Sequence, residues 1–138
     1  MKLVLYCLGG ALVVLVGFSL SPAKGTPGSE DGSNIVSYSR DIIPIIEDKC
    51  LRCHTEEKSN PSELYLDSYS SLMEGGKHGK PVLPGKGEQS ILVQKLGASV
   101  PFGDRMPLKR KSAPTGNYLT EEQVKLIADW IDQGAKNN

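Results

Sequence analysis

Apolar residues in this chain recur at helical spacing in several short segments, and the clearest of these is the last. Its repeating positions are Val124, Ile127, Ala128 and Ile131. Residues spaced by three and four positions share one face of a helix. Thr120 and Gln123 form a capping box ahead of this repeat, and Gly134 follows it. The pattern therefore predicts a C-terminal amphipathic helix that ends at Gly134.

A second apolar repeat lies in the middle of the chain. It consists of the isoleucines at positions 42, 43, 45 and 46. Asp41 is the predicted N-cap, since its carboxylate can accept a hydrogen bond from a free N–H of the first turn. Pro44 falls within that turn, where its missing N–H has no partner to lose. We expect a helix that starts at Asp41 and runs into Cys50.

Two shorter helices are expected between these. Residues 64–66 alternate briefly and predict an extended segment, after which Asp67 or Ser68 caps a helix that ends at Gly75-Gly76. Another helix is predicted over Glu88–Leu96, with glycine directly after it. Short helices joined by long loops rich in glycine and proline predict an all-α domain with little strand.

The N-terminal segment differs from the rest in composition. Lys2 precedes an apolar run from Leu3 to Leu20, and small residues follow, which predicts a signal peptide over residues 1–23. The run is nearly long enough to cross a bilayer, so retention as a membrane anchor stays an open alternative. Residues 24–37 are rich in Gly, Ser, Pro and acidic residues and indicate a flexible linker. The folded domain is expected over residues 38–136.

Charge and cysteine usage narrow the function classes. Lys and Arg together number 16, as do Asp and Glu, so no net charge points to nucleic acid as a partner. The chain has three cysteines, of which Cys7 lies in the apolar run and is expected to be an ordinary apolar residue there. Removal of the signal peptide would leave Cys50 and Cys53, both in one motif.

That motif is Cys50-Leu51-Arg52-Cys53-His54. The C-x-x-C-H spacing is typical of covalent c-type haem attachment. On one helical turn, the two thiols and the imidazole share a face, so the thiols can add to both porphyrin vinyl groups while His54 binds iron. The sequence therefore predicts one haem c held by two thioethers. Its attachment takes place outside the cytoplasm, which agrees with an export signal.

The cysteine pair has two other interpretations, a dithiol redox centre and a zinc site. A thioredoxin-like dithiol would be expected within a βαβ pattern, and none is visible. A zinc site would need further ligands, and the sequence offers only His78 and scattered carboxylates. The histidine directly after the second cysteine favours haem over both.

Three residues are candidates for the second axial ligand. Met106 lies in the Gly/Pro-containing loop Phe102–Pro107, which can place a thioether over a haem face. Met73 sits in an apolar helical segment, so a core role is expected. His78 lies in a polar loop, where an exposed and uncommitted side chain is expected. We favour Met106, because a lone methionine between Arg and Pro in a loop is a poor core residue. The resulting histidine–methionine ligation would raise the reduction potential relative to bis-histidine ligation.

Further roles around the haem are expected for four features. A backbone carbonyl near Val82–Pro84 would accept the second ring N–H of His54. Arg52 and Arg105 could each pair with a haem propionate or be plain exposed cations. Trp130 is expected to pack the last helix onto the first helix and the haem.

The ordered motifs along residues 38–136 resemble the planctomycete-type cytochrome c domain. The residues that carry the resemblance are Asp41–Pro44, Cys50–His54, Leu64–Asp67, Gly75-Gly76, Pro84-Gly85 with Ser90 and Leu92, Arg105–Pro107, Leu119–Glu122 and Trp130–Ala135. The resemblance implies a cytochrome c-like monohaem domain whose first and last helices cross beside the haem. The basic stretch from Lys109 to Gly116 is longer than the family pattern.

The function expected from these features is electron transfer without substrate chemistry. The protein would be an extracytoplasmic monohaem cytochrome, periplasmic, secreted or membrane-anchored, that passes single electrons between redox partner proteins. The basic cluster Lys109–Lys111 could steer acidic partners, although a solvated loop is at least as good an interpretation. The alternatives are a haem module of an enzyme or dehydrogenase complex, or a haem-based ligand sensor.

Overall fold

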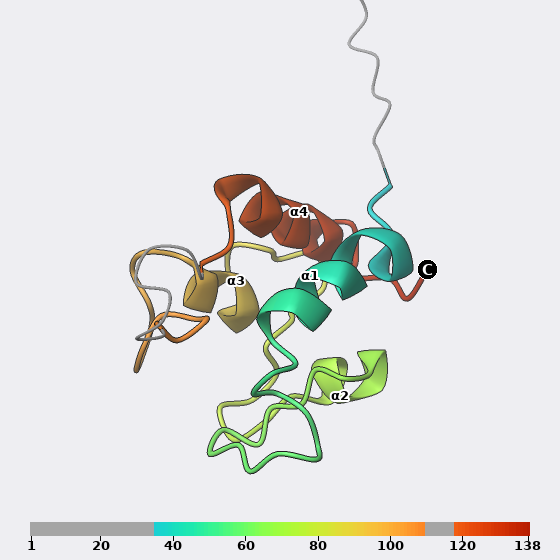
Figure 1. The fold of residues 1–138 in the computed structure, drawn as a ribbon. Coiled ribbons are helices and arrows are strands. Elements are labelled where there is room, and N and C mark those ends of the chain that lie inside the picture. Colours follow the sequence, from blue (N-terminus) through green and yellow to red (C-terminus); the bar gives the residue numbers. More distant parts are fainter. Residues whose placement is uncertain (1–34, 110–117) are drawn as a thin grey trace, which may run out of the picture. The chain divides into compact units, whose positions relative to one another are not determined.

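The computed structural model describes residues 35–109 and 118–138, which contain five helical segments. These are a π-helical turn η1 (Tyr38–Ile42), α1 (Ile43–Lys49), α2 (Tyr69–Glu74), α3 (Ile91–Leu96) and α4 (Glu121–Asp132) (Figure 1). Within the described residues there is no strand, and the β contact there is an isolated bridge between Gly76 and Gly79. The all-α prediction is confirmed for this part of the chain.

The proposed signal segment and most of the linker lie outside the described residues. Residues Ser33–Asn138 form one compact unit. Across residues 35–109 and 118–138, no helix combines the length and apolar character needed to cross a membrane.

The first helical segment begins earlier than the sequence predicts. Ser37, not Asp41, is the N-cap, and its hydroxyl accepts a hydrogen bond from the N–H of Arg40. Asp41 lies within the helical turn and bonds back to the cap, because its carboxylate accepts the Ser37 N–H at 2.8 Å. The helix therefore starts one turn before the isoleucine repeat, and continues directly into α1. Pro44 lies in the first turn of α1, as predicted.

The second and third helices are each six residues long. Ser68 caps α2 by accepting the N–H of Ser71, and Gly75 follows the helix with a φ of +91°. A left-handed φ of this kind strongly favours glycine. Both ends of α2 agree with the sequence prediction.

Helix α3 starts three residues later than the predicted Glu88. Ser90 precedes it with an extended backbone, and its fully buried hydroxyl bonds outside the helix. The hydroxyl accepts the N–H of Leu83 and donates to the carbonyl oxygen of Lys86, each at 2.9 Å. These bonds fold residues 83–90 into turns, so the helix begins only after them.

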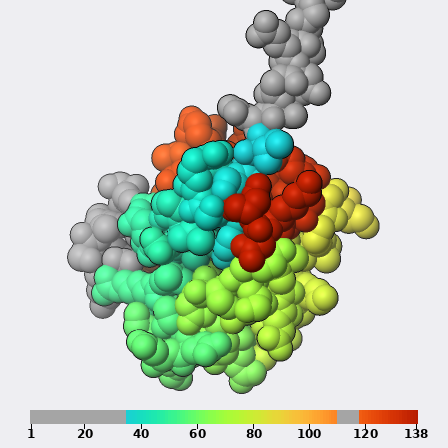
Figure 2. All heavy atoms as spheres, turned by 90° about the vertical axis from the view of Figure 1, so that its right-hand side faces the viewer, coloured from blue at the N-terminus to red at the C-terminus, as the bar shows by residue number. Residues whose placement is uncertain are grey.

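Helix α4 has the predicted capping box between Thr120 and Gln123. Its buried face packs against η1 and α3. Trp130 is fully buried and stacks on Tyr38 with ring centroids 5.3 Å apart. Figure 2 shows the segment that begins at residue 35 beside the last residues of the chain, where the Val36 N–H donates to the Gln133 side chain. The first and last described residues of the domain thus pack against each other.

Candidate haem-binding site

The C-x-x-C-H motif forms one tight turn at the end of α1. The carbonyl oxygen of Cys50 accepts the N–H groups of both Cys53 and His54, each at 3.0 Å. The two hydrogen bonds bring Cys50, Cys53 and His54 together in one turn directly after α1. Cys50 is half-buried, Cys53 is exposed, and both thiols are free.

A cavity of about 720 Å³ lies against this turn. All four predicted haem ligands line it: Cys50, Cys53, His54 and Met106. Much of the rest of its wall is apolar and comes from Leu64, Leu66, Pro81, Ile91, Leu92, Leu96, Phe102, Pro107 and Leu108. The structure therefore brings the four predicted haem-binding residues to one cavity, although Cys50 and Met106 lie 56 positions apart in the sequence.

The acceptor for the His54 ring differs from the predicted one. Nδ1 of His54 lies 2.9 Å from the carbonyl oxygen of Leu64, so the proposed carbonyl near Val82–Pro84 is wrong. The Leu66 N–H donates to the carbonyl oxygen of His54 at 2.9 Å, which holds residues 64–66 alongside the motif. When Nδ1 donates its proton to Leu64, Nε2 carries a free lone pair and can bind a metal.

Asn60 is a further polar neighbour of His54 that sequence reasoning missed. Its amide nitrogen lies 2.7 Å from the Leu64 carbonyl oxygen and 2.9 Å from His54 Nδ1. It sits in a polar stretch with no periodicity and no motif of its own. No sequence signal distinguishes it from the other polar residues of that loop.

Met106 faces the cavity from a loop attached to α3. Its N–H donates to the carbonyl oxygen of Lys95 at 2.8 Å, and its half-buried side chain packs against the core. Met73 also packs against the core but is not among the described residues that line the cavity. The core role expected for Met73 agrees with this placement.

His78, one of the three predicted candidates for the second axial ligand, also lines the cavity. Its side chain is exposed, as expected, but its ring lies against Phe102 with centroids 4.5 Å apart. Since His78 and Met106 both line the cavity with His54, His78 remains an alternative to Met106 as the second axial ligand.

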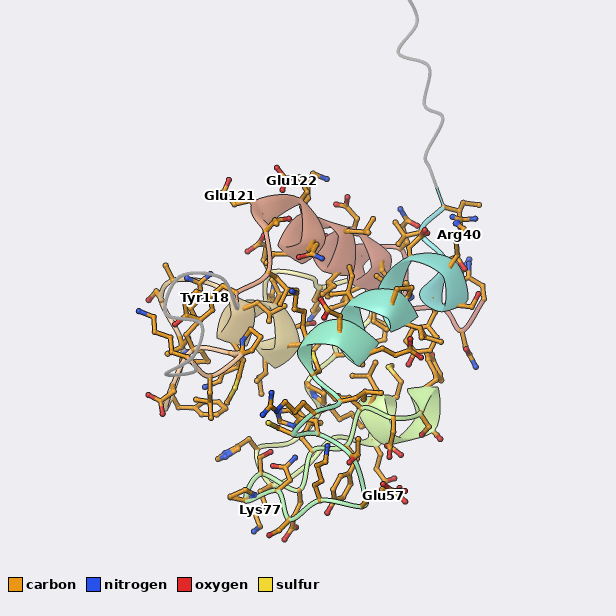
Figure 3. All side chains as sticks on the ribbon, in the orientation of Figure 1. Arg40, Glu57, Lys77, Tyr118, Glu121 and Glu122 are labelled. Atoms are coloured by element: carbon orange, nitrogen blue, oxygen red, sulfur yellow. The ribbon has the colours of Figure 1, made fainter. Side chains whose placement is uncertain are left out.

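The two arginines proposed for haem propionates have different surroundings. Arg52 is exposed and lines the cavity. Arg105 does not: its Nε donates to the Leu96 carbonyl oxygen at 2.9 Å, and its guanidinium lies 4.1 Å from the ring centroid of Tyr118, labelled beside α3 in Figure 3. These contacts hold Arg105 beside Leu96 and Tyr118, and its pairing with a haem propionate stays a prediction. Further cations on the cavity wall are Lys49, Lys58, Lys95 and Lys109.

The structure shows part of what was expected for Trp130 and for the basic cluster. Trp130 packs α4 onto η1, and its Nε1–H donates to the Lys136 carbonyl oxygen at 2.9 Å. It is not among the described residues of the cavity wall, so packing against the haem is not seen. Arg110 and Lys111 of the predicted basic cluster lie outside the described residues.

Burial sets the chemistry of the Cys50 thiol. It raises the pKa of Cys50 to about 11, with smaller contributions from the charges of Asp48 and Cys53. A low-dielectric surrounding disfavours the thiolate, whereas a thioether sulfur carries no charge and no proton. This part of the cavity wall thus suits an uncharged, covalently bonded sulfur.

The residues present fit a covalently bound haem. The cavity is largely apolar, two free thiols lie one turn apart on its wall, and a histidine with a fixed Nδ1 acceptor lies beside them. Within the described residues no cluster of three His, Cys, Asp or Glu side chains could hold a metal ion.

Comparisons with known proteins agree with this site. The sequence model of the family described as Planctomycete cytochrome C matches residues 50–107. Hydrazine synthase subunit alpha of Kuenenia stuttgartiensis is 30% identical over 145 residues, which cover 87% of this chain and 17% of that protein. A solved structure of Kuenenia stuttgartiensis hydrazine synthase covers 75% of this chain and 16% of its own, with 29% identity and a TM-score of 0.47. This chain thus spans about a sixth of the relative's length.

Proposed function

Because residues 50–107 belong to the planctomycete cytochrome c family, we propose that this chain is a monohaem electron-transfer domain. Membership of that family implies a covalently bound haem c. The observation that carries the proposal is the shared cavity, in which the C-x-x-C-H turn and Met106 form parts of one wall. We infer one haem, since the sequence contains one such motif.

The residues of the chain have separate roles in this proposal. Cys50 and Cys53 would hold the haem by two thioethers, and His54 and Met106 would bind its iron. Haem iron with such a ligand pair supplies reversible one-electron chemistry at a relatively high potential. The Leu64 carbonyl would fix the orientation of the His54 ring. The apolar wall would keep water away from the haem, so that fewer water molecules reorient when the iron changes its charge.

The cavity rim supports an acidic redox partner. The described residues that line the cavity include five cations, Lys49, Arg52, Lys58, Lys95 and Lys109, and one carboxylate, Asp104. Lys49 also forms an ion pair with Asp48 at 2.8 Å. Phe102 and Leu108 are exposed beside them and line the same cavity. Cations around a small apolar patch favour rapid, weak and salt-dependent association, which suits a carrier that must release its partner. We propose that this meeting takes place outside the cytoplasm, where haem c is attached.

A second candidate function is a haem module within a larger enzyme. Its support is the similarity to hydrazine synthase subunit alpha, of which this chain matches 17%. In that case, the domain would pass electrons to or from a catalytic centre in another polypeptide or domain. The same His54 and Met106 would be needed, so the two candidates differ in partner rather than in site.

Visible spectroscopy tests the leading proposal. The full chain is co-expressed with haem-maturation machinery, reduced, and recorded before and after addition of carbon monoxide. Sharp α and β bands that do not change with carbon monoxide are expected, because both axial positions are filled by protein. Binding of carbon monoxide to the native protein would favour a sensor or a catalytic haem, and a colourless protein would overturn haem attachment.

Isolation of the native complex separates the carrier from the enzyme module. Size-exclusion chromatography of the solubilised native protein at low salt, followed by 0.3 M salt, is expected to release a free holoprotein. Co-elution with another polypeptide that survives high salt would instead favour the enzyme-module candidate.

A further inference from the structure

The amide of Asn60 has a fixed orientation beside His54. Its Oδ1 accepts the backbone N–H of Ser62 at 3.0 Å and the Ser62 hydroxyl at 2.7 Å. A backbone N–H can only donate, so the atom facing Ser62 is the amide oxygen. The NH₂ group must therefore face the other way, toward Leu64 and His54.

The NH₂ group and the His54 ring meet at a single acceptor. For Nε2 of His54 to bind iron, Nδ1 must carry the proton, and it then donates to the Leu64 carbonyl oxygen 2.9 Å away. In this tautomer Asn60 cannot donate to Nδ1. Its NH₂ donates to the same carbonyl oxygen at 2.7 Å. Leu64 thus accepts two hydrogen bonds, and the shorter one comes from Asn60.

We propose that Asn60 is a positioning residue that weakens the His54–Leu64 hydrogen bond and so raises the reduction potential of the bound haem. The inference rests on the proposed function, because it requires His54 to be an axial ligand. A strong acceptor on Nδ1–H makes an imidazole a better electron donor, which stabilises ferric iron. Sharing that acceptor with a second donor reduces the effect.

The dipole of the amide acts in the same direction. Its NH₂ end carries partial positive charge and lies 2.9 Å from Nδ1. Partial positive charge beside the ligand disfavours the ferric state, which has one charge more than the ferrous state. Both effects therefore favour ferrous iron, and removal of the amide should lower the potential.

Asn60 also builds a local turn, and the test must separate this role from the electronic one. Its carbonyl oxygen accepts the Glu63 N–H at 2.9 Å, and the side-chain contact with the Ser62 N–H is a turn of the Asx type. Asn60→Asp keeps an oxygen for Ser62 and replaces the NH₂ group by an acceptor facing Nδ1. Asn60→Leu has a similar volume and removes both contacts.

The experiment is an equilibrium redox titration of the haem-loaded full chain at pH 7. Wild type, Asn60→Asp, Asn60→Leu and the control Ser59→Asp are compared. Ser59 is exposed, adjacent in the chain and also lines the cavity, so this control adds the same charge near the haem without replacing the amide. Asn60→Asp is expected to have the lowest potential and Asn60→Leu a potential below that of wild type, while Ser59→Asp measures how much of the Asn60→Asp shift comes from the added charge alone.

A second measurement follows the hydrogen bond itself. In the ferrous proteins, the Nδ1–H proton of His54 is observed by NMR, together with its exchange with solvent. The stronger acceptor in Asn60→Asp is expected to shift this proton downfield and to slow its exchange. Asn60→Leu should shift it in the same direction by less.

The outcomes separate this inference from the function on which it rests. Wild-type potentials and an unchanged Nδ1–H signal in both variants would overturn it, and a lower melting temperature alone would show that Asn60 only builds the turn. A shift in Ser59→Asp as large as that in Asn60→Asp would also overturn it. If Asn60→Leu fails to load haem, Asn60→Asp, which keeps the turn, decides the question. A wild type without a six-coordinate haem spectrum would instead refute the proposed function.

Discussion

The backbone N–H of Met106 donates to the carbonyl oxygen of Lys95 at 2.8 Å, which attaches the methionine loop to the last turn of α3. The side chain of Lys95 adds a second connection, since its Nζ donates to the Phe102 carbonyl oxygen at 2.6 Å. Both ends of residues 102–106 are therefore held by one lysine. A helix of six residues thus fixes the position of a candidate axial ligand.

Covalent attachment through both motif cysteines gives the first prediction. Haem in the denatured wild type should remain with the protein through acidic acetone extraction, because thioether bonds survive unfolding. Cys50→Ala or Cys53→Ala should leave at most one thioether and a fragile or colourless product. The measurement is the haem absorbance of the protein pellet, with the mass of the intact chain as a second readout.

Free haem in the acetone supernatant of wild type would contradict covalent attachment. Ser59→Ala is a suitable control, because it alters an exposed position near the motif without removing a sulfur. It should retain its haem in full.

Gly76 leads to a prediction about the His54 acceptor. A Cβ built at this position would lie 2.5 Å from the Ser62 carbonyl oxygen and 2.8 Å from the Leu64 nitrogen. Both neighbours are backbone atoms, so Gly76→Ala must displace residues 62–64 and with them the Leu64 carbonyl. We expect a loss of about 1–3 kcal/mol in the free energy of unfolding, together with a changed reduction potential.

Gly85→Ala is the matched control, because Gly85 is not among the described residues that line the cavity. Gly85 has a φ of +78°, but a Cβ there would meet no atom within 4 Å. Backbone strain should cost about 1–2 kcal/mol, while the Leu64 carbonyl stays in place. Urea unfolding would then show losses in both variants, and redox titration would show a shift only in Gly76→Ala. Equal potentials in the two variants would show that Gly76 does not position the acceptor.

The helices could be predicted from the sequence because their signals are local. Thr120 and Gln123 lie three residues apart, and a capping box needs no other part of the chain. The start of the first helix was placed wrongly because Ser37 and Asp41 both suit a cap, and only the structure shows their reciprocal roles. The start of α3 was predicted three residues too early, because the Ser90 hydroxyl bonds to Leu83 and Lys86 and not to the helix.

The parts of the site that depend on a motif or a residue type could be predicted from the sequence. The cysteines and His54 are predicted from their spacing and Met106 from its loop, and the structure shows that all four line one cavity. The Leu64 carbonyl leaves no trace in a sequence, because every residue has a carbonyl and only the fold selects one. For Arg105 the sequence leaves a propionate pair and an exposed cation open, and only the fold shows its contacts with the Leu96 carbonyl and the Tyr118 ring.

Tyr38 makes stability depend on alkaline pH. Its ring lies between Tyr69 and Trp130, with centroid distances of 5.2 Å and 5.3 Å, and burial followed by the charge of Tyr69 raises the pKa of Tyr38 above 10.0. Above about pH 10 the unfolded chain loses this proton while the folded chain keeps it. The free energy of unfolding should therefore fall as the pH rises through this range.

Tyr38→Phe should remove this contribution. Urea unfolding at pH 8 and at pH 11 gives the fall in the free energy of unfolding between these pH values for each protein. The fall should be larger in the wild type than in Tyr38→Phe. Other alkaline changes, including those at the haem, are common to both proteins and cancel in the comparison. An equal loss in the two proteins would show that Tyr38 does not ionise differently on unfolding.

The identity of the second axial ligand is tested by Met106→Ala. A methionine sulfur on ferric haem gives a weak charge-transfer band at the red end of the visible spectrum. Loss of Met106 should abolish this band, open the iron to carbon monoxide and lower the reduction potential, since the ligand that favours ferrous iron is gone. Absorbance of the ferric protein and a redox titration measure these effects.

Met73→Ala and His78→Ala are the controls, chosen because each side chain offers a different alternative. Met73 packs against the core, so its loss should keep the band and cost about 2 kcal/mol of unfolding free energy. His78 lines the same cavity as Met106, and its replacement should also keep the band. If the wild type lacks the band and His78→Ala changes the spectrum, the ligand pair is His54 and His78. Such a pair would make the protein a carrier of lower potential, because two imidazoles favour ferric iron more than imidazole and thioether do.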